Sequence, residues 1–262
     1  MESLADFLRQ VLLTLALAMP RIVGAMTALS FMGPNVLGGA LARNGVAAAL
    51  SLLVYPIVSV QVAEAKLSGL GLAGAAAKEF LLGMTIGSVV MVIFWCIQAV
   101  GNFIDNQRGA TMASSMDPFI GEQSSPLGLF MTQSMVAVFF CTGLFNGFLG
   151  GVYHSYELWP ATSFWPAIDV DVLTFFVAQF ALISQMALLV GGPVVVAMFL
   201  SELGLGFISR FAPQLNVFFL SMPVKSAVAS LMLVLFWGML IVFFRETLQA
   251  LDLIELFGPL FQ

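Results

Sequence analysis

The sequence has few charged residues for its length, and this shortage decides its broad class. Only 9% of the 262 residues are Asp, Glu, Lys or Arg, while 60% are hydrophobic and the mean hydropathy is +1.03. Soluble domains carry roughly 25% charged and about 45–50% apolar residues. Because so few charges cannot cover a soluble surface, the chain is expected to be an integral membrane protein or a protein embedded in a hydrophobic complex.

Histidine, cysteine and clusters of basic residues are also scarce, and this excludes several functions. The nine Lys and Arg residues stand singly and the net charge is −5, so no binding of nucleic acid is expected. His154 is the only histidine, which leaves no metal-binding spacing and only a thin basis for a serine nucleophile with its base. Cys96 and Cys141 lie in apolar runs, where a thiol acts as a small hydrophobe. We expect no enzyme activity, no catalytic residue, no metal and no cofactor.

Six long stretches without a charged residue dominate the chain. Each is 19 to 34 residues long, and a helix needs about 20 apolar residues to cross a hydrocarbon layer of about 30 Å. They do not alternate in polarity as the strands of a membrane barrel do. The sequence therefore predicts an all-α protein of five to seven long apolar helices, packed as polytopic hairpins in one domain over residues 1–262. The stretches are Ile22–Ala42, Asn44–Ala63, Phe80–Ile104, Gln123–Tyr156, Val172–Ser201 and Ser226–Phe244.

Two sets of glycines recur at a spacing of four residues inside these stretches. Gly83 and Gly87 form one set, and Gly143, Gly147 and Gly151 form the other. Glycines four residues apart share one face of a helix, which lets a second backbone approach closely. Glycine is also common in membrane helices that have no such contact. We expect both sets to pack tightly against a helix of this chain or of another.

The positive charges give no consistent membrane orientation. The segment Glu157–Asp171 holds three acids and no Lys or Arg, so it is expected to face outward. Alternating spans then place four basic residues on each side, which is no bias. Either the number of spans differs by one, or the helices are surrounded by protein and escape the rule. The inner set is Arg43, Arg108, Arg210 and Lys225, and the outer set is Arg9, Lys66, Lys78 and Arg245.

Two groups of polar or aromatic residues lie near expected helix ends. Asp105 and Arg108 are three residues apart, a spacing that permits an ion pair on one helix. Such a pair usually caps or anchors a membrane helix, whereas a proton relay needs further acids that the neighbouring stretches lack. Four aromatic residues are expected to form a belt at the boundary of a membrane or a complex, namely Tyr153, Tyr156, Trp159 and Trp165.

Prolines interrupt the apolar sequence LGLGFISRFAPQLNVFFLSMPVKS, residues 203–226. Pro213 and Pro223 are ten residues apart, and Gly204 and Gly206 precede them. This spacing indicates a broken or re-entrant helix, or else two short helices joined by a turn. A secondary transporter of a small solute would use such a break as its binding site. The candidate residues of this broken-helix motif are Arg210, Pro213, Gln214 and Pro223.

The stretch MASSMDPFIGEQSSPLG, residues 112–128, is a polar segment between two apolar runs. Pro118 disfavours helical geometry at Asp117, and Gly121 and Pro126 add further breaks. Its serines compete for backbone hydrogen bonds. The residues alone therefore predict a flexible polar break between two helices, which is either an ordinary exposed connector or a functional loop.

Two motifs give the chain a family resemblance. The sequence GNFIDNQRGATMASSMDP, which a loop rich in Ser and Pro follows, and the later RFAPQLNVFFLSMP resemble the FliR/SctT family. The resemblance covers essentially the whole chain and is strongest over residues 101–128 and 203–223. The segment LGGALARNGVAAALSLLVYP, residues 37–56, is more similar to the virulence-type, injectisome branch than to the flagellar branch.

The resemblance implies a non-enzymatic role in protein export. Members of this family are export-gate components of type III secretion systems at the bacterial inner membrane, where they join other small hydrophobic proteins in a helical cone. It implies SctR/FliP-like and SctS/FliQ-like proteins as partners, together with the SctU/FlhB-like switch protein, and unfolded secreted polypeptides as substrates. The cone is expected to stand largely above the membrane plane, partly on the periplasmic side, which would explain the missing charge bias.

The resemblance also implies a channel plug in the polar loop. The family's plug corresponds to the loop around Met116–Pro126, where little apolar area holds the segment in place. Met112 and Met116, with Phe119 and Ile120, would add a compliant apolar seal around a passing chain. The transporter of a small solute is the alternative, although no internal repeat supports it. The implied plug residues are Met112, Met116, Asp117, Pro118, Phe119, Ile120, Gly121, Glu122, Ser124, Ser125 and Pro126.

Overall fold

The protein is built from long helices, as the sequence predicts. The computed structural model describes residues 2–64, 69–109, 115–116, 123–163, 172–212, 214 and 216–250. Within these residues, five helices are long and apolar enough to cross a membrane, and a bent pair of helices brings the number to six if it counts as one span. This result confirms the predicted class of an all-α, multi-pass membrane protein.

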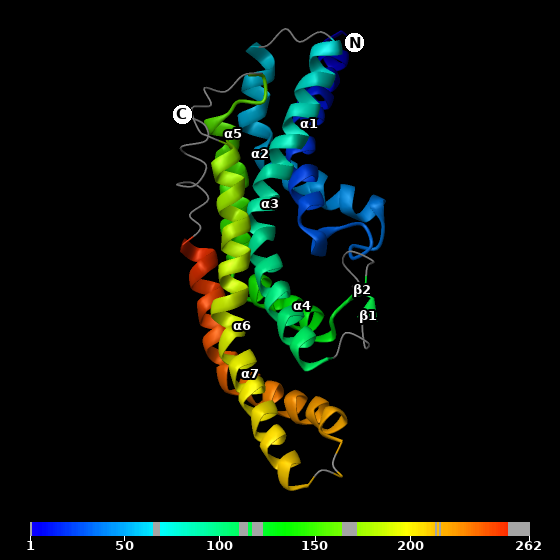
Figure 1. Cartoon of the computed structure of the whole chain (residues 1–262). Helices are drawn as coiled ribbons and strands as arrows, with labels where there is room; N and C mark the ends of the chain where they lie inside the picture. The colour runs from blue at the N-terminus through cyan, green and yellow to red at the C-terminus, as the bar shows by residue number, and fades with distance from the viewer. Residues whose placement is uncertain are drawn as a thin grey trace.

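Figure 1 shows how the helices are arranged. In chain order the helices are α1 (Glu2–Ala28), the 3-10 turn η1 (Ser30–Met32), α2 (Ala40–Glu64), α3 (Gly69–Arg108), α4 (Pro126–Cys141), α5 (Leu144–Leu158), α6 (Val172–Phe211) and α7 (Val217–Ala250). Two strands of two residues each, β1 (Ser115–Met116) and β2 (Gln123–Ser124), lie between α3 and α4.

Helix α3 is the axis around which most of the other helices pack, while α2 packs against α1 and α5. Its 40 residues make it about 60 Å long. Within the chain, 61% of its most apolar segment is buried, against 17% for the corresponding segments of α6 and α7. Helices α1 and α6 run along it, and α4 packs against its C-terminal part (Figure 1). The two last helices therefore keep most of their apolar surface outward.

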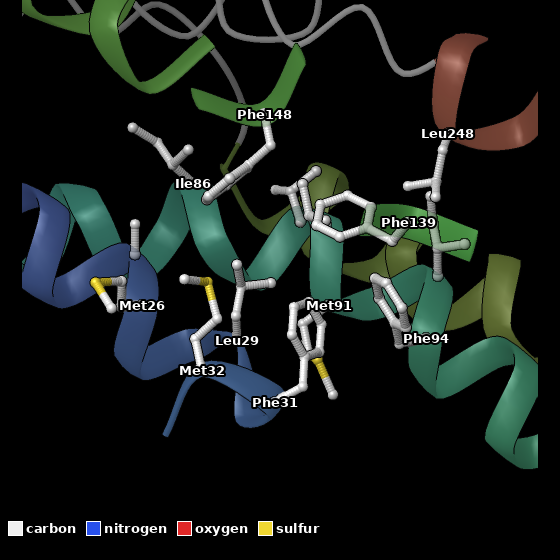
Figure 2. Close-up of a cluster of buried hydrophobic side chains, with 14 of the residues drawn as sticks. Met26, Leu29, Phe31, Met32, Ile86, Met91, Phe94, Phe139, Phe148 and Leu248 are labelled. Atoms are coloured by element: carbon white, nitrogen blue, oxygen red, sulfur yellow. The ribbon is translucent and has the colours of Figure 1, made fainter. Parts of the chain in front are cut away.

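Aromatic rings from four elements form the centre of the core. Between centroids, the ring of Phe94 on α3 lies 4.8 Å from Phe31 on η1, 5.6 Å from Phe139 on α4 and 5.4 Å from Phe244 on α7. Figure 2 shows the rings of Phe94, Phe31 and Phe139 among methionine and leucine side chains. Aromatic pairs of this kind contribute about 0.5–1.5 kcal/mol each beyond the area that they bury. Since the four elements are distant in sequence, this cluster joins the two halves of the chain.

Glycines allow α1 and α3 to touch backbone to backbone. A Cβ atom on Gly83 of α3 would overlap the carbonyl oxygen of Arg21 on α1, and one on Gly87 would collide with the carbonyl oxygen of Ala25. Gly24 on α1 is equally close to the backbone of α3. Gly83 and Gly87 therefore lie on the face of α3 that meets α1, where any larger residue would push the helices apart.

The apolar stretch from residue 123 to residue 156 is not one helix. It forms α4 and α5, which meet at a bend of 73°. Gly143 sits at this bend with a φ of +78°, a left-handed conformation that favours glycine. The prediction that Gly143 shares a packed helix face with Gly147 and Gly151 is therefore wrong, because Gly143 precedes α5. Within this chain a Cβ on Gly147 would meet nothing within 4 Å, whereas Gly151 is buried.

The bent pair extends along most of α3. Leu127 at the start of α4 donates its backbone N–H to Asp105 on α3, while Ser155 near the end of α5 bonds to Arg21, the partner of Glu79 on α3. Residues 79 and 105 of one helix are separated by about 39 Å at about 1.5 Å per residue. This separation exceeds a hydrocarbon layer of about 30 Å. Helices α4 and α5 together are therefore long enough to cross a membrane as one broken span, whereas a shallow re-entrant loop would be shorter.

Helices α6 and α7 form a hairpin whose tip extends beyond α4 (Figure 1). Of the two alternatives predicted for residues 203–226, the structure agrees with two helices joined by a turn, although α6 continues through both glycines to Phe211 and α7 runs through Pro223, so neither helix is short. The two helices, which end at Phe211 and begin at Val217, are 40 and 34 residues long. Proline inside such helices is tolerated where neighbouring groups satisfy the freed backbone.

The contact between α1 and α3 predicts that one added methyl group is costly. Gly83→Ala should lower the free energy of unfolding by about 1–3 kcal/mol, because the new Cβ forces two packed backbones apart. Gly238→Ala on α7 is the matched control, since a Cβ there meets nothing within 4 Å. This control should be neutral or stabilising by up to about 1 kcal/mol through helix propensity. Denaturation in detergent of each variant, solubilised with the proteins that co-purify with the chain, measures both changes in stability, and equal effects would contradict the contact.

Candidate functional site

The polar loop predicted to be functional leaves α3 and enters α4, and the two helices touch at its base. A Cβ atom on Gly101 of α3 would lie 2.5 Å from the Cα of Gly128 on α4, which leaves no room for a side chain. The hydroxyl of Ser125 accepts a hydrogen bond from the N–H of Gly128 at 3.0 Å, and Pro126 is the first helical residue. A serine cap and a first-position proline start a helix. The sequence SSPLG therefore begins α4 directly against α3.

Two side chains of α3 hold the start of α4. The Oδ1 of Asn102 accepts a hydrogen bond from the hydroxyl of Ser125 at 2.6 Å. The completely buried carboxylate of Asp105 accepts the backbone N–H of Leu127 at 2.9 Å and pairs with Nε of Arg108 at 2.6 Å. A carboxylate at a helix N-terminus is stabilised by the free amides and the helix dipole. We call Asn102, Asp105, Arg108 and Ser125 the loop clamp.

The loop clamp gives the predicted charged pair a structural setting. Both carboxylate oxygens of Asp105 have protein partners, one on its own helix and one on α4. Arg108 is the last residue of α3, where a cation also complements the negative end of the helix dipole. The pair is therefore placed to anchor the junction of two helices.

The described part of the loop is a short antiparallel pairing. Ser115 lies opposite Ser124, and Met116 lies opposite Gln123. Gly109 follows α3 with a φ of +79°, the left-handed conformation in which many helices end. The chain that leaves α3 and the chain that enters α4 are thus joined twice, at the loop clamp and at the two strands.

Part of the predicted plug falls on described residues. Met116 and Ser124 lie in the paired strands, while Ser125 and Pro126 begin α4. Ser125 and Pro126 therefore belong to the base of the loop, because they cap a helix. The other predicted plug residues lie outside the described residues: Met112, Asp117, Pro118, Phe119, Ile120, Gly121 and Glu122.

The described residues of the broken-helix motif are spread around the turn between α6 and α7. Arg210 is exposed in the last turn of α6, Gln214 is exposed in the turn, Pro223 lies inside α7, and Pro213 lies outside the described residues. An ion pair that the sequence did not indicate joins the two helices nearby. The Nζ of Lys225 lies 2.8 Å from Oε2 of Glu202. This part of the hairpin is therefore tied together by charge as well as by apolar contact.

A second polar cluster lies buried towards the other end of α3, and the sequence analysis missed it. Arg21 of α1 and Glu79 of α3 are completely withdrawn from solvent and form two bonds, of 2.6 Å and 2.9 Å. Lys78 reaches the same carboxylate at 2.8 Å. Arg21 also donates to the hydroxyl of Ser155 and to the carbonyl oxygen of Trp159, each at 2.9 Å. We call Arg21, Lys78 and Glu79 the ionic cluster.

The ionic cluster corrects the predicted aromatic belt. Tyr156 is completely buried, with its ring centroid 4.0 Å from the guanidinium carbon of Arg21. Trp159 is only 8% exposed, and the centroid of its ring lies 5.2 Å from the ammonium of Lys78. Trp165 lies outside the described residues. Tyr156 and Trp159 therefore cover buried cations through their ring faces and do not mark a membrane boundary.

The chemistry of the remaining reactive groups is limited. Among the described residues, no three His, Cys, Asp or Glu side chains are placed to bind one metal ion. Cys96 is buried on α3 and Cys141 is exposed at the end of α4, and both are free thiols. His154 pairs with Glu157 on the same helix at 2.9 Å. Within the part of the chain that the structure describes, the loop clamp, the ionic cluster and the ion pair between α6 and α7 join helices to one another.

Comparison with known proteins decides the family. The family described as bacterial export proteins, family 1, matches residues 12–251. The chain belongs to this family. It is 43% identical over 233 residues to Yop proteins translocation protein T of Yersinia pestis, which covers 89% of each chain. It is 32% identical over 236 residues to secretion system apparatus protein SsaT of Salmonella typhimurium, covering 88% of this chain and 90% of that one.

A flagellar relative is less similar. Flagellar biosynthetic protein FliR of Bacillus subtilis is 31% identical over 170 residues, covering 64% of this chain and 66% of that one. These findings confirm the resemblance to the FliR/SctT family, and the higher identity and coverage of the Yersinia protein agree with the injectisome branch. Membership of a family of export proteins overturns the alternative of a solute transporter with a binding site at residues 203–223.

The loop clamp predicts that Asp105 contributes more to stability than an exposed acid of the same chain. Asp105→Ala should lower the free energy of unfolding by about 1.5–3 kcal/mol, because the Leu127 N–H and the Arg108 guanidinium lose a buried, charged partner. Glu202→Ala is the matched control, since the Glu202 side chain is 48% exposed. Glu202→Ala should lower the free energy of unfolding by less than about 1 kcal/mol. Denaturant titration in detergent, with the chain solubilised together with the proteins that co-purify with it, compares the two variants, and similar losses would argue against the clamp.

Proposed function

We propose that this protein is a non-enzymatic, channel-forming subunit of a type III secretion export gate of the injectisome type, in the bacterial inner membrane. Family membership over residues 12–251 carries this proposal, together with 43% identity to a Yersinia translocation protein. Its partners in the gate are SctR/FliP-like and SctS/FliQ-like proteins and the SctU/FlhB-like switch protein. Unfolded secreted polypeptides pass through the channel that these subunits form, and part of the assembly stands on the periplasmic side.

The outward surface of α6 and α7 supports a place inside an assembly. Large apolar side chains are more than half exposed along both helices, among them Phe180, Phe199, Phe207, Phe219 and Val234. Large exposed apolar surfaces mark contacts with protein or lipid. In a gate of several hydrophobic subunits, these side chains pack against neighbouring helices.

Within the gate, the loop between α3 and α4 is the channel plug. Two features of its base support this role. The loop clamp and the close approach of Gly101 to Gly128 join the helices that the loop connects. The pairing of β1 with β2 joins its two chain segments again. The loop sequence is rich in serine, glycine and proline and has few large apolar side chains to hold it in place, so a passing polypeptide can displace it at little cost to the surrounding helices.

The proposed subunit role predicts dependence on partners. The chain expressed alone should aggregate or be degraded, because its exposed apolar helices lack their neighbours. Co-expression with the SctR/FliP-like and SctS/FliQ-like proteins should yield one complex that co-purifies through a tag on this chain. Co-expression with each partner singly is the control. A well-behaved monomer, stable in detergent without partners, would overturn the proposal.

The plug predicts increased ion leakage when the loop is shortened. Replacement of Asp117–Glu122 by two glycines spares Ser125, which caps α4. The assembled variant should conduct ions across a membrane more readily than the wild type, because less chain fills the lumen. The matched control replaces the six residues Pro34–Gly39, between η1 and α2, by two glycines and should leave conductance unchanged. Unchanged conductance of an assembled plug variant would rule out this role.

A further inference from the structure

The ammonium group of Lys78 is surrounded by backbone oxygen atoms. It donates hydrogen bonds to the carbonyl oxygens of Pro160, Ala161 and Ser163, at 3.1, 3.2 and 2.7 Å. The carboxylate of Glu79 supplies a fourth oxygen at 2.8 Å. The side chain is only 12% exposed, so these protein groups replace most of the water around the charge.

The three carbonyl oxygens belong to one turn, residues 159–163, which we call the carbonyl turn. It follows α5, whose last carbonyl groups have no partners within the helix. The N–H of Ser163 bonds to the carbonyl of Pro160 at 3.1 Å, and the indole N–H of Trp159 bonds to the carbonyl of Ser163 at 3.0 Å. These bonds fold the turn so that its oxygen atoms converge on Lys78.

Neutralisation of Glu79 does not account for the position of Lys78. Arg21 already binds both oxygens of that carboxylate. Lys78 therefore leaves the ionic cluster with two cations and one anion. The excess positive charge faces the carbonyl turn and the C-terminal end of α5, where the helix dipole places negative partial charge.

We propose that the Lys78 ammonium fills a monovalent-cation site, formed by the carbonyl turn and Glu79, and that this filled site fixes the end of α5 to α3. Carbonyl oxygens of this kind replace the hydration shell of potassium in ion channels. An ammonium ion and a potassium ion are close in size and charge, so the same oxygens suit both. In this protein the cation is tethered to α3 by its own side chain, which makes its binding a link between two helices. The inference does not depend on the proposed role in export.

Chemical rescue tests this site in the full chain, solubilised with the subunits that co-purify with it. Lys78→Ala should lower the thermal unfolding midpoint in choline chloride, because the carbonyl oxygens lose their cation. Potassium or ammonium chloride at equal ionic strength should raise the unfolding midpoint of this variant again by about 2–4 °C, a typical shift for a moderate gain in stability. Lithium chloride should restore nothing, because its ion is too small for these oxygens.

Two controls separate the cation site from a general loss of packing or charge. Lys78→Met fills the space of the lysine stem without a charge, so it should lower the midpoint with no response to potassium. Lys225→Ala removes a cation that pairs with Glu202, so it should show no preference among the salts. Equal responses of Lys78→Ala to potassium, lithium and choline would overturn the proposal, as would a Lys78→Met variant as stable as the wild type.

A third variant decides the matter if Lys78→Ala does not fold. Lys78→Arg keeps the charge next to Glu79 but brings a larger, planar group among the three carbonyl oxygens. The cation site predicts a lower unfolding midpoint than that of the wild type. An unfolding midpoint equal to that of the wild type would show that the charge alone is needed, and would overturn the proposal.

Discussion

The packing of α1, α3 and α5 depends on the pairing of Arg21 with Glu79. Both side chains are completely buried, and an unpaired charge at such a position costs several kcal/mol. Helices α1 and α3 can therefore associate only in the register that brings the two together. Gly83, one turn beyond Glu79, allows the backbones to come close enough. Arg21 then binds Ser155 and Trp159, so one side chain also fixes the end of α5.

Ion pairs within the fold explain why several of the counted positive charges carry no orientation signal. The rule for membrane orientation counts basic residues in loops, where they face the solvent on one side. Lys78, Arg108 and Lys225, three of the residues used for that count, are 12%, 20% and 15% exposed and each forms an ion pair. Cations that join helices say little about the side of a membrane. A chain with few charges thus uses several of them inside its own fold.

Local and distant contacts differed in how far they could be predicted. The spacing of Asp105 and Arg108 indicated an ion pair because both lie on one helix, within one turn. The bond from Asp105 to α4 was not foreseen, since its partner is 22 residues away. Arg21 and Glu79 are 58 residues apart, and only the isolated charge within an apolar run hinted that Arg21 needs a partner. The bend at Gly143 was missed because no charged residue marks it.

The sequence by itself determined the all-α membrane class, the approximate helix number, the family and the place of the polar loop. These properties follow from composition, from the length of apolar runs and from motifs whose residues act on their close neighbours. Only the tertiary structure decided which charges meet, which glycines face a helix, and that Tyr156 and Trp159 cover cations. Those outcomes depend on buried groups finding partners across helices, and the spacing of residues along one chain does not specify such partners.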